Sequence, residues 1–161
     1  MSHKELQKIK REFSRLHLNP IYLEHEPVIT SEDAAKTRGF ELKQGIKAIV
    51  LTNDSEFVVV DVPGDKKVDV KKVAEKLNWQ KGKIRMATHE EVLEKTGCEI
   101  GAVPPFGHKM KLKILADGKI YDNEESAFNI GLRTHSAKVS TREIKIIFGY
   151  AGAEDGDFSK N

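Results

Sequence analysis

Hydrophobic spacing and capping residues predict five helices along the chain. Residues 3–17 are expected to form an amphipathic helix, because apolar residues recur there every three or four positions. The other four helices follow residues that can cap a helix N-terminus, namely Thr30, Asp69, Thr88 and Ser140. They are expected at 31–39, 69–77 and 88–97, and directly before residues 146–148.

Strand patterns lie between these helices. Residues 46–51 and 57–62 are nearly continuous apolar runs, which predicts two adjacent antiparallel strands covered on both faces. Residues 109–114 alternate lysine with apolar residues and predict a strand with one basic face, which Asp117-Gly118 would join through a hairpin to residues 120–121. Shorter strands are expected at 21–23, 83–87, 127–132 and 134–139. The order of elements is typical of an α+β fold.

An eleven-residue segment between a helix and a strand, residues 97–107, contains three glycines and two prolines. Such a segment cannot continue a helix or a central strand, so we expect a loop. Several of its residues are apolar, which is unusual for a connection that only turns the chain. Glycines that allow close backbone approach, stiffened by prolines, could present N–H groups to an anion or a carbonyl oxygen. A rigid structural loop is an equally good interpretation of the local pattern.

Length and composition favour one domain over residues 1–150 with a mobile tail over residues 151–161, where Gly, Asp and Glu predominate. The single cysteine, Cys98, excludes an internal disulfide and multi-cysteine zinc sites. No nucleotide-binding, zinc-hydrolase or nucleophile-elbow motif occurs, so we expect no metal and no cofactor. The N-terminus lacks the apolar core of a signal peptide and no run approaches membrane-spanning length. We therefore expect a cytoplasmic protein with no membrane partner.

Charge is balanced overall but segregated locally. The net charge is +2, from 27 basic and 25 acidic residues, which does not suggest a protein that coats nucleic acid. A basic stripe is expected on the first helix, opposite its apolar face. A second basic patch is expected on the helix that Asp69 begins. Both could be solvated faces or contacts for nucleic-acid phosphates. The candidate residues are Lys4, Lys8, Arg11, Arg15, Lys71 and Lys72.

Three residues have side chains whose chemistry needs an explanation. Lys47 lies in an otherwise apolar strand, where an ammonium is costly unless it meets an anion or reaches water. Asp61 in the neighbouring strand is a candidate counter-ion. Cys98 has no evident partner base and is expected to be structural rather than nucleophilic.

At this point the order of the motifs resembles the YbaK family of aminoacyl-tRNA editing domains, which is related to the insertion domain of bacterial prolyl-tRNA synthetase. The matching positions are His25-x-Pro27-Val28-x-Thr30, Lys47, the glycine-proline segment from Gly97 to Gly107, and Asn129-x-Gly131 before Ser136 and Val139. The resemblance implies a mixed, largely antiparallel sheet that curves toward a barrel and is flanked by helices. It also implies trans-editing hydrolysis of mischarged aminoacyl-tRNA, most often tRNA for proline that carries alanine or cysteine. An aminoacyl-tRNA synthetase is an implied further partner.

The resemblance also assigns roles to individual residues. Lys47 would engage the terminal adenosine or its phosphate, and the backbone that begins at Gly101 would hold the substrate carbonyl, so these two are the implied catalytic residues. The implied substrate-binding residues are His25, Thr30, Ala102, Val103, Pro104, Pro105, Phe106, Asn129, Gly131 and Ser136. Many relatives have serine at the position of Pro104 and serine near the position of Asn129, so the amino acid that is removed stays open.

Two other functions are compatible with these patterns. A non-catalytic module that binds tRNA or a synthetase would keep the pocket without turnover. A hydrolase of small aminoacyl or peptidyl esters would act without tRNA, and would lack salt-dependent tRNA binding. The presence of both Lys47 and the glycine loop favours the editing deacylase.

Overall fold

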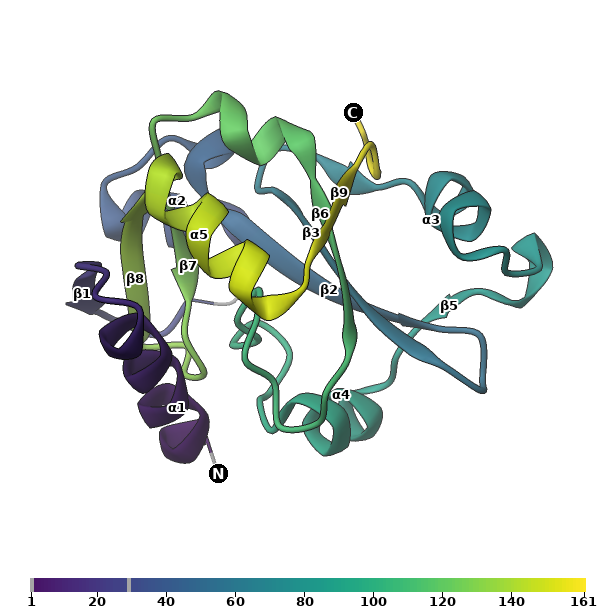
Figure 1. The fold of residues 1–161 in the computed structure, drawn as a ribbon, viewed down its shortest axis with the longest axis horizontal. Coiled ribbons are helices and arrows are strands. Elements are labelled where there is room, and N and C mark those ends of the chain that lie inside the picture. Colours follow the sequence, from purple (N-terminus) through teal and green to yellow (C-terminus); the bar gives the residue numbers. More distant parts are fainter. Residues whose placement is uncertain (1, 29) are drawn as a thin grey trace.

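The computed structural model describes residues 2–28 and 30–161, which form five α-helices and ten strands (Figure 1). The helices are α1 (Ser2–Arg15), α2 (Ser31–Arg38), α3 (Val70–Leu77), α4 (His89–Thr96) and α5 (Thr141–Ala151). The strands are β1 (Ile21–Glu24), β2 (Ile46–Thr52), β3 (Phe57–Pro63), β4 (Lys67–Val68), β5 (Arg85–Met86), β6 (Lys113–Asp117), β7 (Glu125–Asn129), β8 (His135–Ser140), β9 (Glu154–Gly156) and β10 (Ser159–Lys160). Three short 3-10 helices complete the fold: η1 (Leu42–Gln44), η2 (Lys81–Lys83) and η3 (Gly118–Asp122).

The strands form a mixed, mainly antiparallel arrangement, which confirms the α+β fold class. One sheet has the order β5-β2-β3-β6-β9, with parallel pairing of β6 to β3 and to β9. A second, antiparallel sheet has the order β1-β8-β7, and β10 pairs with β4. Among the described residues the two larger sheets meet at an isolated bridge between Gly45 and Ala127, so the curved arrangement does not close into a barrel.

Capping chemistry explains why the helices start where they do. Thr30, Asp69, Thr88 and Ser140 each accept a hydrogen bond from a backbone N–H in the first turn of the helix that follows, as their sequence positions predict. Gly39 and Gly97 end α2 and α4 in the left-handed conformation. The last helix is longer than expected, because α5 includes residues 146–148.

The predicted pair of buried strands is confirmed. β2 and β3 are antiparallel neighbours, and apolar clusters cover both faces of the sheet that they form. One cluster packs against α1 and α5 around Phe106, whose ring meets Phe13, Phe128 and Phe148 edge to face. The other packs β2, β3 and β6 against α3 and Phe158. Close packing on both faces therefore makes this sheet a rigid support for the residues along its edges.

The strand predicted at 109–114 and its hairpin are wrong. Residues 109 and 110 donate their backbone N–H groups to carbonyls at the end of α4, and β6 starts only at Lys113. The chain does not turn back at Asp117-Gly118, because Asp117 caps η3 through Lys119 N–H and also accepts a bond from Phe158 N–H. The aspartate carboxylate thus stabilises a helical turn and not a hairpin.

The end of the chain also differs from the expected mobile tail. β9 extends the five-stranded sheet, and β10 pairs with β4. Phe158 between them is 2% exposed, and its backbone N–H and carbonyl are both hydrogen-bonded. Composition alone could not indicate this, because one aromatic residue among polar neighbours fixes the segment by burial.

Candidate functional site

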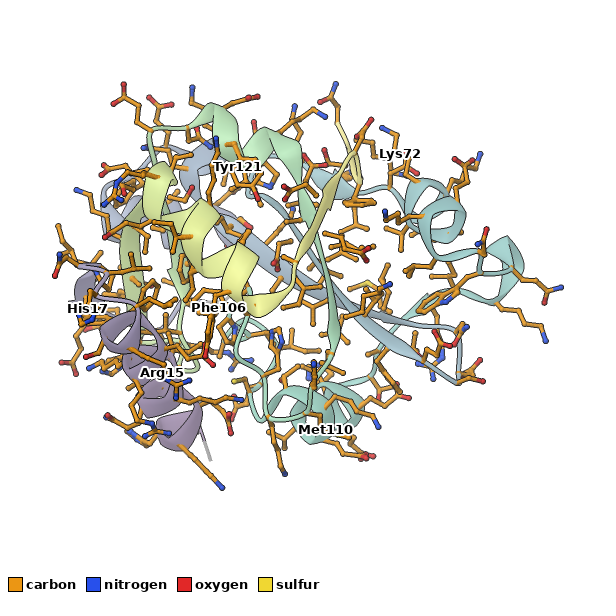
Figure 2. The ribbon with its side chains drawn as sticks, in the orientation of Figure 1. Arg15, His17, Lys72, Phe106, Met110 and Tyr121 are labelled. Atoms are coloured by element: carbon orange, nitrogen blue, oxygen red, sulfur yellow. The ribbon has the colours of Figure 1, made fainter. Side chains whose placement is uncertain are left out.

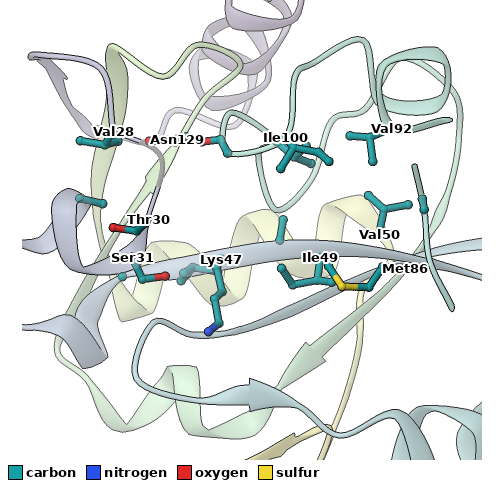
Figure 3. Close-up of a pocket in the computed structure, with 17 residues that line it drawn as sticks. Val28, Thr30, Ser31, Lys47, Ile49, Val50, Met86, Val92, Ile100 and Asn129 are labelled. Atoms are coloured by element: carbon teal, nitrogen blue, oxygen red, sulfur yellow. Dashed lines mark hydrogen bonds between the residues drawn. The ribbon is translucent and has the colours of Figure 1, made fainter. Parts of the chain in front are cut away.

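A pocket of about 280 Å³ lies between the edge of β2, α2, α4 and the loop of residues 97–107 (Figure 3). Its wall is mainly aliphatic, with a few polar groups, which is the usual composition of a small-molecule site. The lining residues are Val28, Thr30, Ser31, Ala34, Gly45, Ile46, Lys47, Ala48, Ile49, Val50, Met86, Ala87, Val92, Ile100, Gly101, Val103 and Asn129. Thr30, Lys47, Gly101, Val103 and Asn129, which the sequence singles out, thus line one pocket.

The β2 edge contributes backbone groups to this wall. β5 pairs with only the last two residues of β2, so the edge before them borders the pocket. The Val50 carbonyl accepts the N–H of Ala87 across this edge (2.9 Å). Alternate residues of an antiparallel strand direct their backbone groups to the same side, so Ala48 directs its N–H and carbonyl toward the pocket.

The glycine loop forms a tight turn at the opposite wall. Ala102 N–H donates to the Glu99 carbonyl (2.9 Å), and Gly101, at the third position of this turn, has φ of +89°. A type II turn requires a positive φ at that position, which glycine adopts without strain. One segment holds the other three carbonyls of the turn: Arg133 donates to Ile100, Asn129 to Gly101, and Gly131 N–H to Ala102.

These tethers determine where the loop N–H groups point. In a planar trans peptide, the carbonyl and the N–H of the next residue point in opposite directions. The carbonyl tethers therefore turn the N–H groups of Gly101 and Val103 away from the 129–133 segment. Neither donates to an acceptor within the described chain. Ala102 N–H is used inside the turn, so the tethers leave the N–H groups of Gly101 and Val103 as donors that this loop can offer to a ligand.

His25, Ser136 and Asn129 form a hydrogen-bonded chain behind the loop. The His25 Nε2 atom is 2.7 Å from the Ser136 hydroxyl, which donates to Asn129 Oδ1 at 3.2 Å. The Asn129 amide then donates to the Gly101 carbonyl. Asn129 lines the pocket, whereas His25 and Ser136 are outside its lining and connect to the loop through Asn129. Gly131 also contacts the loop from this side, because its N–H donates to the Ala102 carbonyl.

Lys47 enters the pocket wall from β2. Figure 3 shows its amine end directed across the strand, away from Asn129 and Ile100. Burial lowers the pKa of this ammonium, Asp65 opposes the effect and Lys67 adds to it. Asp61 is not its counter-ion: it pairs with Ala48, not with Lys47, and within the described chain its buried oxygens have no hydrogen-bond partner. Successive residues of a strand face opposite sides of the sheet, so the Asp61 side chain shares the face of Ala48 and lies on the opposite face from Lys47.

Four residues of the loop that were expected to bind substrate lie behind the pocket. Ala102, Pro104, Pro105 and Phe106 are buried and absent from its lining. Phe106 anchors the loop in the aromatic cluster, and His108 donates through Nε2 to the Pro104 carbonyl (2.7 Å). Their apolar character reflects the packing that fixes the loop.

The expected tRNA-contact residues do not form one surface. Arg15 and Lys72 lie at opposite ends of the molecule in Figure 2. Three of the six are engaged within the chain: Lys8 donates to the His108 carbonyl, Arg15 to the Tyr150 hydroxyl, and Lys72 to Asp157. Lys4, Arg11 and Lys71 are exposed.

Neither Cys98 nor a metal cluster adds chemistry to the described site. Cys98 is fully buried, and its burial raises the pKa of the thiol to about 12, which keeps it protonated and inert. The described residues contain no group of three or more His, Cys, Asp or Glu side chains that could hold a metal ion. Every helix in the described ranges is too short or too polar to cross a membrane.

Sequence patterns missed the aliphatic wall and Arg133. Ala34, Ala87 and Val92 carry no chemical signal and come together only through the packing of α2, α4 and β5 around β2. Arg133 follows Gly131 in a segment expected to contain strands, where an arginine usually suggests an exposed position. No local pattern links Arg133 to the loop, because its partner Ile100 is 33 positions away.

The fold and the pocket combine an apolar wall, a loop of oriented backbone donors and a lysine, an arrangement that suits the stabilisation of negative charge on an acyl oxygen. The aminoacyl-tRNA editing domain family matches residues 25–146. The chain belongs to this family, whose members are ester hydrolases of aminoacyl-tRNA.

Individual relatives agree with this assignment. The chain is 32% identical over 124 residues to the multifunctional Ser/Thr-tRNA deacylase ProXp-y of Escherichia coli (strain K12), covering 74% of this chain and 73% of that protein. It is 35% identical over 89 residues to the proline–tRNA ligase of Trichlorobacter lovleyi, covering 55% of this chain and 15% of that enzyme. A crystal structure of a proposed trans-editing enzyme for prolyl-tRNA synthetase superimposes with a TM-score of 0.81 at 24% identity, over 98% of both chains. This last similarity concerns the fold.

Proposed function

We propose that this protein hydrolyses the ester that joins a small amino acid to the 3′-terminal ribose of a mischarged tRNA. The observation that carries the proposal is the turn at Gly101: residues 129–133 hold the carbonyls of Ile100, Gly101 and Ala102 from one side, which leaves the N–H groups of Gly101 and Val103 for a ligand at the wall of an apolar pocket. A donor pair of this kind suits the oxyanion that forms when water attacks an ester.

The loop would act as the oxyanion hole. Gly101 and Val103 N–H groups would stabilise the negative charge on the carbonyl oxygen in the tetrahedral intermediate. Because the loop is fixed by Phe106 and by its carbonyl tethers, these donors need no reorganisation during the reaction. Neither a side-chain nucleophile nor a metal is required for this stabilisation, and the tRNA itself could help to position the water.

Lys47 would hold the nucleotide end of the substrate. Its ammonium points away from the loop, which suits a contact with the phosphate or ribose of the terminal adenosine better than a contact with the ester carbonyl (Figure 3). An anion beside it would also offset the burial that lowers the pKa of the ammonium. Lys47 would thus orient the ester toward Gly101.

The size of the pocket favours a small amino acid. Alanine and cysteine on tRNA for proline are the substrates that the family resemblance implies, and the Escherichia coli relative is named for serine and threonine. An apolar pocket cannot strongly reject an added hydroxyl, which is worth about 100-fold at most. Thr30 and Ser31 at the wall could also accept a hydroxyl hydrogen bond. All four amino acids are therefore substrate candidates.

The tRNA body would contact exposed basic residues near the loop. α1 packs against the loop through the Lys8–His108 bond, so Lys4 and Arg11 on α1 lie on the helix that supports the site. Lys71 and Lys72 lie on α3, at the far end of the molecule from α1 (Figure 1). A contact through α1 would be weakened by salt, as phosphate contacts generally are.

The experiment is amino-acid release from tRNA for proline charged separately with alanine, cysteine, serine, threonine and proline. We expect release of at least one small amino acid and sparing of proline. Lys47→Ala should lower kcat/KM by about 10- to 100-fold, the effect of losing one charge-assisted hydrogen bond of about 1.5–3 kcal/mol.

Lys43→Ala is the matched control, because Lys43 is an exposed lysine four positions away that pairs with Glu41. It should retain the rate of the unmodified protein. If all five esters survive while the protein still binds the tRNA, the protein is a binding module and the proposal is wrong.

A further inference from the structure

Arg133 joins the two walls of the pocket, although it does not line it. Its Nε and Nη2 atoms donate to the Ile100 carbonyl at 3.0 and 2.6 Å, and its own carbonyl accepts Val28 N–H at 3.0 Å. Val28 and Ile100 both line the pocket, and Figure 3 shows them on either side of Asn129. Arg133 therefore forms hydrogen bonds with one residue in each of the two walls, Val28 and Ile100.

The guanidinium holds the peptide group that carries the Gly101 N–H. The Ile100 carbonyl and the Gly101 N–H belong to the same plane, so two hydrogen bonds on the oxygen direct the N–H away from Arg133. This is the central peptide of the turn, and its rotation distinguishes a type II turn from a type I turn. Without a donor on the Ile100 oxygen, the peptide would be free to rotate and move the N–H out of the pocket.

Glu99 balances the charge of Arg133 while the guanidinium keeps its hydrogen bonds to the Ile100 carbonyl. Glu99, the first residue of the turn, lies 3.3 Å from Nη1, the nitrogen that does not contact Ile100. A planar guanidinium can satisfy both partners at once, whereas a lysine offers one point of charge. The arrangement thus depends on arginine specifically.

We propose that Arg133 is a positioning residue of the deacylase, which fixes the Ile100–Gly101 peptide so that the Gly101 N–H faces the ester oxygen. The inference rests on the proposed function and adds to it a residue that acts through the loop backbone. It does not touch the substrate. Removal of Arg133 should therefore lower kcat with little change in KM, because the substrate contacts at the pocket wall remain.

The test compares Arg133→Ala and Arg133→Lys with the unmodified protein in the deacylation assay. We expect Arg133→Ala to lower kcat by about 100-fold, the effect of a displacement of about 1 Å at a reacting centre. Arg133→Lys should recover part of this loss. Added guanidinium chloride at low millimolar concentration should also raise the rate of Arg133→Ala, because the free ion can occupy the vacated position beside Ile100.

Two matched variants isolate the role of the carbonyl tether. Arg142→Ala removes an exposed arginine from the start of α5, and Glu99→Gln removes the ion pair but leaves the Ile100 tether in place. Arg142→Ala should behave as the unmodified protein, and Glu99→Gln should retain most of the rate. A thermal unfolding curve for each variant corrects activity for the folded fraction.

Amide hydrogen exchange tests the same inference without turnover. The Ala102 amide, which donates to Glu99 and closes the turn, should exchange faster in Arg133→Ala than in Arg142→Ala, while exchange in β2 and β3 stays unchanged. Unchanged kcat per folded molecule, or equal Ala102 exchange in the two variants, would overturn the positioning role. If no aminoacyl-tRNA is hydrolysed by the unmodified protein, the proposed function fails, and the exchange rates still decide whether Arg133 fixes this peptide.

Discussion

His108 is a buried histidine that supports the loop from behind. Its Nε2–H donates to the Pro104 carbonyl, and burial lowers the pKa of the ring to about 4. The folded protein therefore favours the neutral ring, whereas the unfolded chain takes up a proton near pH 6.5. The stability that this group contributes is present above pH 6.5 and is lost as the pH falls toward 4.

His108→Gln removes the titrating ring while glutamine can still donate to Pro104. Between pH 7 and 4 the unmodified protein should lose roughly 3 kcal/mol more of its free energy of unfolding than this variant does. Urea unfolding at several pH values measures the difference. His89→Gln, at an exposed position in α4, controls for the loss of a histidine. Parallel pH profiles for the unmodified protein and His108→Gln would contradict the prediction.

At the scale of elements, the turn before Pro104 illustrates how a glycine can be needed for function and not only for folding. Gly101→Ala should cost about 1–2 kcal/mol of stability, because an L side chain is strained at positive φ. It should also lower kcat by about 100-fold, since the N–H that would bind the oxyanion moves. Deacylation and urea unfolding of the same samples separate the two effects.

Gly152→Ala is the matched control for this strain. Gly152 ends α5 at φ of +78°, and a Cβ there would meet no atom within 4 Å. The two variants should lose similar stability, but Gly152→Ala should retain full kcat. Equal kcat in both variants would show that the Gly101 loop does not take part in the reaction.

For the whole molecule, the end of the chain is a structural part of the fold. Phe158 packs into the cluster between the sheet and α3, and its backbone joins Asp69 and Asp117. Phe158→Ala should lower the free energy of unfolding by about 3–5 kcal/mol, measured in urea. Lys160→Ala, at an exposed position in β10, should stay within about 0.5 kcal/mol. A change in the free energy of unfolding below 1 kcal/mol for Phe158→Ala would instead support the mobile tail that composition predicts.

The elements that the sequence predicted well are those determined by nearby residues. The caps at Thr30, Asp69 and Thr88 each involve hydrogen bonds within four positions, and glycines end α2 and α4 at the expected residues. The strand at 109–114 failed because its alternating lysines imitate a strand while the backbone bonds to α4. The hairpin at Asp117 failed because its carboxylate has a partner 41 positions away.

The family resemblance grouped Lys47, Gly101 and Asn129 in one site, whereas the sequence by itself determined the local structure: the helix caps, the buried β2–β3 pair and the need for a loop at residues 97–107. These depend on spacing and on backbone restrictions, which act over a few residues. Only the tertiary structure decided which loop residues face the pocket, that His25 and Ser136 support the loop, and that Arg133 holds it. Those contacts join segments 30 or more positions apart in the chain, and their geometry follows from packing that no local pattern encodes.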